Sequence, residues 1–422
     1  MRILVSAYAC TPGYGSEQGV GWHRVRQLAR FHEVWAITRV KNRKPILEAM
    51  AKEPMPNVHW IYHDLPRWAR FWKKKRRGVH LYYYLWQMTA YLRARAVHRS
   101  IGFDQVHHVT FVNYWMPSFL VLLPVPFIWG PVGGGEAPPA GFWRFFSARG
   151  KAYEILRAIA QRIGERDPFL RLTARRASVA LATTNDTAKR LTALGCRNVI
   201  IYSEAGLPQQ DLDLLGTLPI HRSSPFRIVS LGDLLHLKGF ELGLRAFARF
   251  HSRIPQSEYW IMGDGPERKR LETIACELGV SQSVVFWGRI PRSEVLRKLE
   301  QCDVLMHPSL HDSGGWVCLE AMAAGRPVLC LDIGGPGLQV TAQTGIKIPA
   351  NSPEQAIVEM ANSMEQLALN PELRIRMGEA GRERVRDLFA WDRKGDWLQN
   401  LGTEVAQCQG HPFPVEGMQD AG

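Results

Sequence analysis

The stretch "DVLMHPSLHDSGGWVCLEAMAAGRPVLCLD", residues 303–332, decides the fold class. Its two short apolar runs, "DVLMHPSL" and "RPVLCLD", are typical of buried strands. Between them lie the loop "HDSGG" and the helical segment "WVCLEAMAA", with Gly325 as the predicted C-cap. A strand, a helix and a second strand in this order indicate a βαβ unit and therefore a parallel sheet.

Two series of such units extend outward from this stretch. The second series starts near Phe226, and the first covers the N-terminal half with strands expected at 2–8, 33–39, 58–64, 105–111 and 125–131. The Pro-, Gly- and Ser-rich segment between them predicts a linker. The expected organisation is an N-terminal domain at 1–202, a linker at 203–225, a C-terminal domain at 226–390, a closing helix at 391–408 and a disordered tail at 409–422. Each domain is expected to be a doubly wound, Rossmann-like α/β domain.

The composition fits a globular protein with an anionic partner. Apolar residues make up 46% of the 422 residues, and the formal net charge is +14. The seven cysteines contain no C-x-x-C pair, which favours reduced thiols in the cytosol and no metal site. The N-terminal residues indicate a first strand rather than a signal peptide, and the longest apolar run, 118–130, is too short to span a bilayer.

Two carboxylates flank the glycine pair of the deciding stretch, Asp312 in the loop and Glu320 about two turns into the helix. The start of a helix offers free backbone N–H groups and partial positive charge, which suit phosphate. Glu320 is placed to accept hydrogen bonds from ribose hydroxyls, and Asp312 with Ser313, Gly314 and Gly315 to reach a sugar. The alternative is structural, with Asp312 capping the helix and Glu320 solvated.

Other strand ends of the C-terminal half carry candidate ligands for phosphate or a base. Lys238 opens a helix after the strand that ends at Gly232, and a lysine there is a natural ligand of a diphosphate. Gly265 lies in a tight turn beside which a planar base fits, and Arg289 follows another strand-end glycine. Gly334 and Gly335 precede a helix and form a further candidate phosphate cradle.

The N-terminal half offers fewer specific signals. Its first strand is followed by Gly15 and Ser16, which allow a close approach to a phosphate or sugar, although no G-x-G-x-x-G or Walker A pattern is present. His107 and His108 stand late on a strand, where either one contacts a sugar hydroxyl or is structural. The loop "GPVGGGEAPP" adds Gly134 and Glu136 as candidate contacts to an acceptor.

The segment 66–87, "PRWARFWKKKRRGVHLYYYLWQ", is basic and interleaved with aromatic residues. Its large apolar content favours an anionic membrane surface over nucleic acid, and a plain solvated charge run is the third interpretation. The "DLD" motif at 211–213 lies in the expected linker and is interpreted as a chance match to a metal-binding D-x-D motif.

The series "GDLLHLKGF", "GDGPER", "FWGRI" and "HPSLHDSGGWVCLEAMAAGRPV" resembles the donor-binding half of the group 1 (family GT4) retaining glycosyltransferases. "ACTPGYGSEQGVGW" and "HHVTFVNYWMPSF" resemble the acceptor-binding half of members that build bacterial surface polysaccharides. The resemblance runs from residue 2 to near residue 400. It implies the GT-B fold, with two Rossmann-like domains facing across a cleft and a C-terminal helix that crosses back to the first domain.

By the same resemblance, Glu320 holds the nucleotide ribose, Asp312 with its loop holds the sugar ring, and Lys238 holds the diphosphate. A histidine contacts the sugar, and His108 is the closer match, with His107 as the alternate. Relatives usually have Arg where this chain has Asp233. This departure leaves open weak activity, an altered donor, or compensation by another cation such as Arg289.

The implied activity is the metal-independent transfer of a hexose, with retention, from a UDP- or GDP-linked sugar to a saccharide acceptor, and the basic and aromatic segment 66–87 favours a lipid-linked acceptor. No cofactor and no nucleic-acid partner are expected, and the expected location is the inner face of the plasma membrane. The alternatives are a nucleotide-sugar epimerase, a sugar phosphorylase, and a non-catalytic scaffold of a polysaccharide assembly complex.

Overall fold

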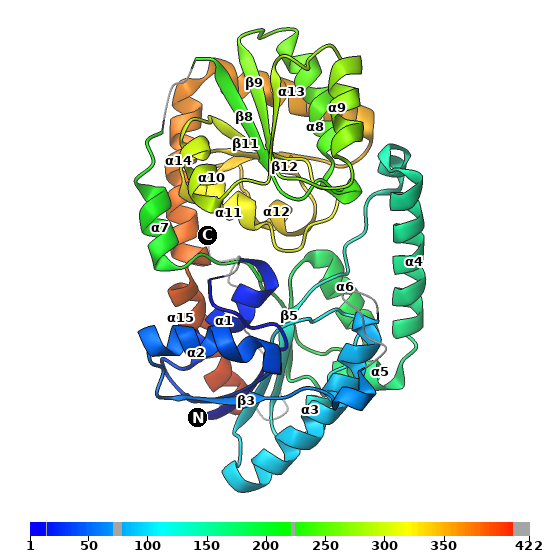
Figure 1. Cartoon of the computed structure of the whole chain (residues 1–422), viewed down its shortest axis with the longest axis vertical. Coiled ribbons are helices and arrows are strands. Elements are labelled where there is room, and N and C mark those ends of the chain that lie inside the picture. The colour runs from blue at the N-terminus through cyan, green and yellow to red at the C-terminus, as the bar shows by residue number, and fades with distance from the viewer. Residues whose placement is uncertain (14, 71–77, 221–223, 408–422) are drawn as a thin grey trace. The chain divides into compact units, whose positions relative to one another are not determined.

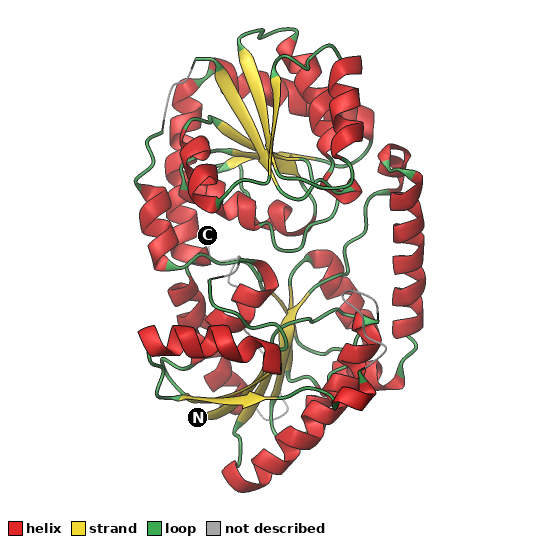
Figure 2. Ribbon diagram, viewed as in Figure 1, coloured by secondary structure: helices red, strands yellow, loops and turns green. Residues whose placement is uncertain are grey.

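The computed structural model describes residues 1–13, 15–70, 78–220 and 224–407 (Figure 1). Helices alternate with the strands of two parallel sheets (Figure 2). The chain divides into two compact units. The first contains Met1–Gly135, Ala158–Glu204 and the segment from Trp391 onward, and the second contains Glu136–Arg157 and Ala205–Ala390. The predicted pair of Rossmann-like α/β domains is confirmed.

The sheet of the first unit has, within the described residues, seven parallel strands in the order β3-β2-β1-β4-β5-β6-β7. The strands are β1 (Arg2–Ser6), β2 (Glu33–Thr38), β3 (Val58–Tyr62), β4 (Gln105–His108), β5 (Phe127–Val132), β6 (Val179–Ala182) and β7 (Val199–Ile201). The helices that belong wholly to this unit are α1 (Ser16–Leu28), α2 (Arg43–Lys52), α3 (Val79–Ile101), α5 (Pro168–Arg176), α6 (Asn185–Leu194) and α15 (Trp391–Gln407).

The sheet of the second unit has, over the same described ranges, six parallel strands in the order β10-β9-β8-β11-β12-β13. The strands are β8 (Phe226–Leu231), β9 (Ser257–Met262), β10 (Val284–Gly288), β11 (Val304–His307), β12 (Val328–Leu331) and β13 (Gly345–Ile348). The helices are α7 (Gln209–Gly216), α8 (Phe240–His251), α9 (Arg268–Glu277), α10 (Arg292–Glu300), α11 (Trp316–Ala323), α12 (Gly334–Gln339), α13 (Pro353–Leu369) and α14 (Pro371–Arg384).

The sequence produces these sheets because most of its strands are short runs rich in apolar residues. All residues of β11 and β12 are buried, as parallel strands with helices on both faces require. The strand order reverses beside β1 in the first unit and beside β8 in the second. Ligands of open α/β sheets bind outside the carboxyl ends of the strands at such a reversal. In the second unit, the loops after β8 and β11 are therefore where a ligand is expected to bind.

The last helix returns to the first unit, as predicted. It packs against α1, where Gln27 donates a hydrogen bond to Asp392 at 2.8 Å and Trp391 stacks on His23. Lys394 is buried in this contact and donates to the carbonyl of Ser203 at 2.7 Å. A π-helical turn, Val385–Phe389, separates α14 from this returning helix.

Three predicted segments compare with the structure in different ways. Residues 136–157, which the sequence analysis assigned to the N-terminal domain, lie in the second unit. The expected linker contains α7, which packs against α11 of that unit. The predicted tail 409–422 and the basic run 73–77 lie outside the described residues. No helix within the described ranges is long and apolar enough to cross a membrane.

Candidate functional site

Lys238 and Asp312 meet at the strand-order reversal of the second unit. Lys238 ends the short 3₁₀ helix His236–Lys238, which follows β8, and Asp312 lies in the loop after the neighbouring strand β11. The Lys238 Nζ donates to Asp312 Oδ2 at 2.5 Å, and both side chains are mostly buried. Two residues distant in sequence thus meet because β8 and β11 are adjacent.

The Asp312 carboxylate accepts four hydrogen bonds. Besides Lys238, His307 Nε2 lies 3.0 Å from Oδ2, and the backbone N–H groups of Gly314 and Gly315 donate to Oδ1 at 3.2 and 3.0 Å. Burial alone raises the pKa of Asp312, but the hydrogen bond from His307 and the charge of Lys238 outweigh it and hold the pKa far below its ordinary value. Burial lowers the pKa of His307, so this imidazole is neutral and donates. Asp312 therefore fixes Lys238 and the loop.

The structural alternative for Asp312 is only partly right. The N-cap of α11 is Gly315, which adopts the left-handed conformation with φ +60°. Because glycine has no side chain, no side-chain hydrogen bond caps this helix. Asp312 instead binds the backbone of the loop that precedes this helix. The same carboxylate thus organises both the loop and the cation of the neighbouring strand.

Glu320 is partly buried on α11 and belongs to a second network. Its Oε1 accepts from Arg292 Nη1 at 2.6 Å, and Arg292 Nη2 donates to Asp211 Oδ2 at 2.9 Å. Burial raises the pKa of Glu320, and the charge of Arg292 only partly offsets this effect. Glu320 is therefore not the freely solvated side chain of the alternative interpretation. Asp211, in the motif interpreted as a chance match, is part of the network.

Arg289 forms an ion pair with Asp233. Its Nη2 is 2.6 Å from Asp233 Oδ1, and the two residues follow glycines at the ends of β10 and β8, respectively. Both side chains are exposed, so the pair contributes little to stability. The pair places the guanidinium of Arg289 at the carboxyl ends of the strands. Gly232, at φ +144°, directly follows β8 and precedes Asp233.

Gly334 and Gly335 do not form the predicted phosphate cradle. The N–H of Gly335 donates to the carbonyl of Asp312 at 2.8 Å, and Gln339 donates to the carbonyl of Gly314 at 2.5 Å. A Cβ on Gly335 would overlap the carbonyl oxygen of Ser313. These glycines are needed because α12 packs directly on the loop that carries Asp312. Glycine is needed at position 265 for a similar reason, because a Cβ there would overlap the backbone of Leu234.

We expect Gly335→Ala to lower the free energy of unfolding by about 1–3 kcal/mol, because the added methyl group must displace the backbone of the loop. Gly216→Ala is the matched control, since a Cβ at Gly216 meets no atom within 4 Å. The control should change stability by less than about 1 kcal/mol. Urea unfolding of both variants measures the difference, and equal stabilities would contradict the close approach.

His107 and His108 lie in the core of the first unit rather than at an open strand end. His107 Nε2 is 2.8 Å from Gln105 Oε1, and His108 Nε2 is 2.7 Å from the hydroxyl of Tyr83 on α3. Burial lowers the pKa of both imidazoles, that of His108 to about 3. The sequence did not reveal that α3 covers this face of β4. We therefore assign neither histidine a contact with substrate.

The other candidates of the first unit lie at its glycine-containing loops. Gly15 is the N-cap of α1, and Ser16 follows with a φ of +59°. Both are exposed, and no atom lies within 4 Å of a Cβ placed on Gly15. The carbonyl of Gly134, at φ +89°, accepts a hydrogen bond from Gln161 at 3.0 Å. The turn at Gly15 therefore leaves space for a ligand, whereas the side chain of Trp115 fills the space beside Gly134.

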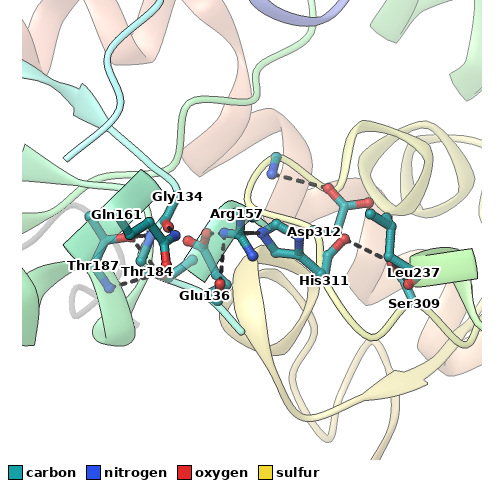
Figure 3. A network of polar contacts seen from close by, with 12 residues as sticks. Gly134, Glu136, Arg157, Gln161, Thr184, Thr187, Leu237, Ser309, His311 and Asp312 are labelled. Atoms are coloured by element: carbon teal, nitrogen blue, oxygen red, sulfur yellow. Dashed lines mark hydrogen bonds and ion pairs between the residues drawn. The ribbon is translucent and has the colours of Figure 1, made fainter. Parts of the chain in front are cut away.

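Glu136 lies in the second unit, next to the loop of Asp312 (Figure 3). Its buried carboxylate is 3.5 Å from His311 Nε2, and Arg157 donates to its carbonyl at 2.8 Å. Arg157 Nη2 also lies 3.2 Å from His311. The roles of Arg157, His311, His307 and Arg292 were not predicted from the sequence. Of these, only His307 and His311 carried a signal, since both precede Asp312 at the end of β11.

Within the described residues, no group of three His, Cys, Asp or Glu side chains is arranged to hold a metal ion. The polar groups brought together are instead cations and backbone N–H groups at the carboxyl end of a sheet. Lys238, Arg289 and the loop 313–315 all follow strands of this sheet and are candidate anion ligands, with the N–H groups of Gly314 and Gly315 already donating to Asp312, and Glu320 adds a carboxylate. Such a set suits a ligand that combines phosphates with hydroxyl groups.

Comparison with known proteins agrees with this chemistry. Residues 220–384 match the model of the family described as glycosyl transferases group 1. The chain is 32% identical over 192 residues to the D-inositol 3-phosphate glycosyltransferase of Corynebacterium jeikeium (strain K411), which covers 43% of this chain and 45% of that protein. It is 31% identical over 179 residues to the lipopolysaccharide core biosynthesis glycosyltransferase LpsE of Rhizobium meliloti (strain 1021), with 42% and 50% covered.

The chain thus spans about half the length of these curated relatives. Its whole fold is similar to the crystal structure of Alr3699/HepE from Anabaena in complex with UDP. The TM-score is 0.61 at 16% identity, and the match covers 96% of this chain and 100% of that one. The chain therefore has the GT-B fold, and over residues 220–384 it is similar in sequence to the glycosyl transferases group 1.

Proposed function

We propose that the protein transfers a hexose, with retention of configuration, from a nucleotide-diphosphate sugar to a saccharide acceptor in surface polysaccharide biosynthesis. The observation that carries the proposal is Lys238, held by Asp312 at the strand-order reversal of the second unit. This unit contains the segment similar to glycosyl transferases group 1. The proposed acceptor is lipid-linked, and the relative LpsE, named for lipopolysaccharide core biosynthesis, supports an acceptor of this class.

In this proposal, the cations of the second unit stabilise the leaving nucleoside diphosphate. Lys238 binds the diphosphate, and Arg289 supplies the second positive charge in place of the arginine that Asp233 replaces. Fixed charges aimed at the developing negative charge lower the barrier without reorganising in the transition state. Asp312 acts as a positioning residue, because its carboxylate is occupied by four donors.

Glu320 is proposed to bind the ribose hydroxyls of the donor, and Ser313 with the two following glycines the hexose. A carboxylate accepts two hydrogen bonds from a vicinal diol, whereas a neutral amide accepts fewer. The carboxylate of Glu136 lies beside the same loop and is proposed to contact the acceptor. The donor is UDP- or GDP-linked in this proposal, and no residue of the site distinguishes the two bases.

The test is turnover of a panel of UDP-, GDP- and dTDP-hexoses, with release of nucleoside diphosphate as the readout. We expect one donor class to be used and Lys238→Ala to lower kcat/KM by about 10²-fold, because a charge-assisted hydrogen bond to phosphate is lost. Lys269→Ala, at an exposed position on α9, is the control. Proton NMR of the product reports retention.

Four outcomes would overturn the proposal. Donor conversion without any acceptor indicates an epimerase, and phosphate-dependent cleavage indicates a phosphorylase. Donor binding in calorimetry without turnover of any donor indicates the scaffold. Full activity of Lys238→Ala would remove the observation on which the assignment depends.

A further inference from the structure

Helix α4 (Ala148–Gly164) has its polar face turned inward. The packed positions recur at steps of four and three residues, namely Gly150, Glu154, Arg157, Gln161 and Gly164. Glu154 pairs with His236 at 3.2 Å. Arg157 and Gln161 donate to the backbone carbonyls of Glu136 and Gly134 (Figure 3). The two glycines lie against His236 and Trp115, where a Cβ would overlap the side chain. Small and polar residues therefore anchor the helix.

The opposite face of α4 is apolar and exposed. Ile155, Ile159 and Ile163 follow one another at four-residue steps, so they form a single stripe, and Leu156 and Tyr153 widen it. Their exposed fractions run from 47% at Ile159 to 67% at Leu156. Five of the sixteen exposed large hydrophobic residues in the described part of the chain lie on this helix. Single exposed apolar residues are ordinary, but a contiguous patch marks an interaction site.

Basic residues border this stripe. Arg149, Lys151 and Arg162 are exposed on α4, and Arg166 follows its end. The one acidic residue in the sequence of the helix is Glu154, which points inward toward His236 and Arg157. The exposed face of α4 therefore combines large aliphatic side chains with positive charge alone.

We propose that this face of α4 docks on a membrane surface that contains anionic lipid. An amphipathic helix with an aliphatic face and flanking Lys and Arg binds in the plane of such a surface, because burial of the apolar residues and attraction to the headgroups act together. A second copy of the chain is the poorer occupant of this face. A symmetric pairing of α4 with α4 places Arg149, Lys151 and Arg162 of one copy near the same basic residues of the other copy, and no acidic residue on this face offsets the repulsion.

The inference deepens the proposed function, on which it rests for its role: a lipid-linked acceptor lies at such a surface. It assigns the contact to α4 rather than to the basic run 73–77. The two assignments are separable, since they lie in different segments of the chain.

The experiment is flotation of the full chain with vesicles of phosphatidylcholine, with and without phosphatidylglycerol. We expect the wild type to float with the anionic vesicles, and Leu156→Glu/Ile159→Glu/Ile163→Glu to lose at least about tenfold in partitioning, because apolar burial is replaced by charge repulsion. Leu47→Glu/Leu369→Glu, at exposed apolar positions on α2 and α13, is the matched control and should float like the wild type.

A second variant, Arg149→Gln/Lys151→Gln/Arg162→Gln, keeps the apolar stripe and tests the charge. It should reduce partitioning onto anionic vesicles and remove its dependence on salt. It also keeps the inference testable if the glutamate variant does not fold. Nucleotide-sugar turnover with a water-soluble acceptor should be unchanged in both variants.

Flotation that neither variant reduces would overturn the inference, as would failure of the wild type to float. A wild-type dimer that becomes monomeric in the glutamate variant would identify a second copy as the occupant and overturn it as well. If the wild type floats as expected but turns over no nucleotide sugar, the result would contradict the proposed function and leave the membrane contact of α4 in place. If substitutions at residues 73–77 abolish flotation and those on α4 do not, the membrane contact would be assigned to residues 73–77.

Discussion

Glu320→Gln is expected to lower kcat/KM for the nucleotide-sugar donor by about 10²-fold. A charge-assisted hydrogen bond contributes about 1.5–3 kcal/mol, and the substitution removes the charge and one acceptor facing the proposed ribose hydroxyls. The loss should appear mainly as weaker donor binding, since the ribose does not change during transfer. Steady-state kinetics with the active donor and calorimetry with its nucleoside diphosphate measure the two effects.

The fold should tolerate this substitution. Burial raises the pKa of Glu320, so the folded protein already disfavours the charged carboxylate, and a glutamine amide of equal size retains a hydrogen bond from Arg292. The control is Glu354→Gln, at an exposed residue of α13 that pairs with Arg144. Wild-type donor affinity in Glu320→Gln would contradict the ribose assignment, whereas equal losses in both variants would indicate a general effect of charge.

The pH dependence supplies an independent check. Because the pKa of Glu320 is raised, its protonation as pH falls begins above the range of an ordinary glutamate. Donor affinity should therefore decline on the acid side at a higher pH than an exposed carboxylate gives. This acid limb should be absent in Glu320→Gln.

The alternation of strands and helices was predictable because most of the parallel strands are runs rich in apolar residues and bounded by loop residues. For example, "DVLMHPSL" and "RPVLCLD" contain β11 and β12, which are buried on both faces. The return of α15 to the first unit followed only from the family resemblance. Its contacts, such as Lys394 with the Ser203 carbonyl, connect residues 191 positions apart and leave no local signal.

The site was predictable where its residues follow strands, and not where helices bring them together. Lys238 and Asp312 stand at the ends of β8 and β11, so the sheet order alone brings them together. Arg292, in contrast, reaches Glu320 and Asp211 from a third helix, α10, and its contacts depend on how α7, α10 and α11 pack.

Two interpretations failed for a related reason. A glycine pair before a helix looks the same in sequence whether it faces a phosphate or a neighbouring loop. The structure shows the loop of Asp312 against Gly335, and the N–H of Gly335 is already used. Likewise, a histidine at a strand end does not reveal that Tyr83 of α3 covers it.

Asp312→Asn is the prediction with the largest expected effect on stability. Asp312 accepts hydrogen bonds from Lys238 and His307 through one carboxylate oxygen and from backbone N–H groups through the other. An asparagine replaces one of these two acceptor oxygens by an NH₂ donor, so at least one buried donor loses its acceptor. Removing one partner of a buried ion pair costs about 3–5 kcal/mol, and because the Lys238 side chain is partly exposed, we expect about 2–3 kcal/mol. Urea unfolding at neutral pH, followed by a probe in the second unit, measures the loss.

The pH dependence has a defined sign. The folded-state pKa of Asp312 lies below its unfolded-state value, so its stabilisation is fully present above the unfolded-state pKa of about 3.9 and is lost as pH falls below it. The stability difference between wild type and Asp312→Asn should therefore shrink in acid. Asp213→Asn, at an exposed residue of α7 that accepts from Gln209, is the control and should show only a small difference in stability.

A double-mutant cycle with Lys238→Met separates the ion pair from the other contacts of Asp312. If the charge of Lys238 accounts for much of the loss, then the double variant should be more stable than the sum of the single losses predicts, by about 1–3 kcal/mol. The remaining loss belongs to His307 and to the N–H groups of Gly314 and Gly315, which asparagine satisfies only in part. Strict additivity would show that Lys238 is not held by Asp312, and the proposed diphosphate site would then lack its positioning residue.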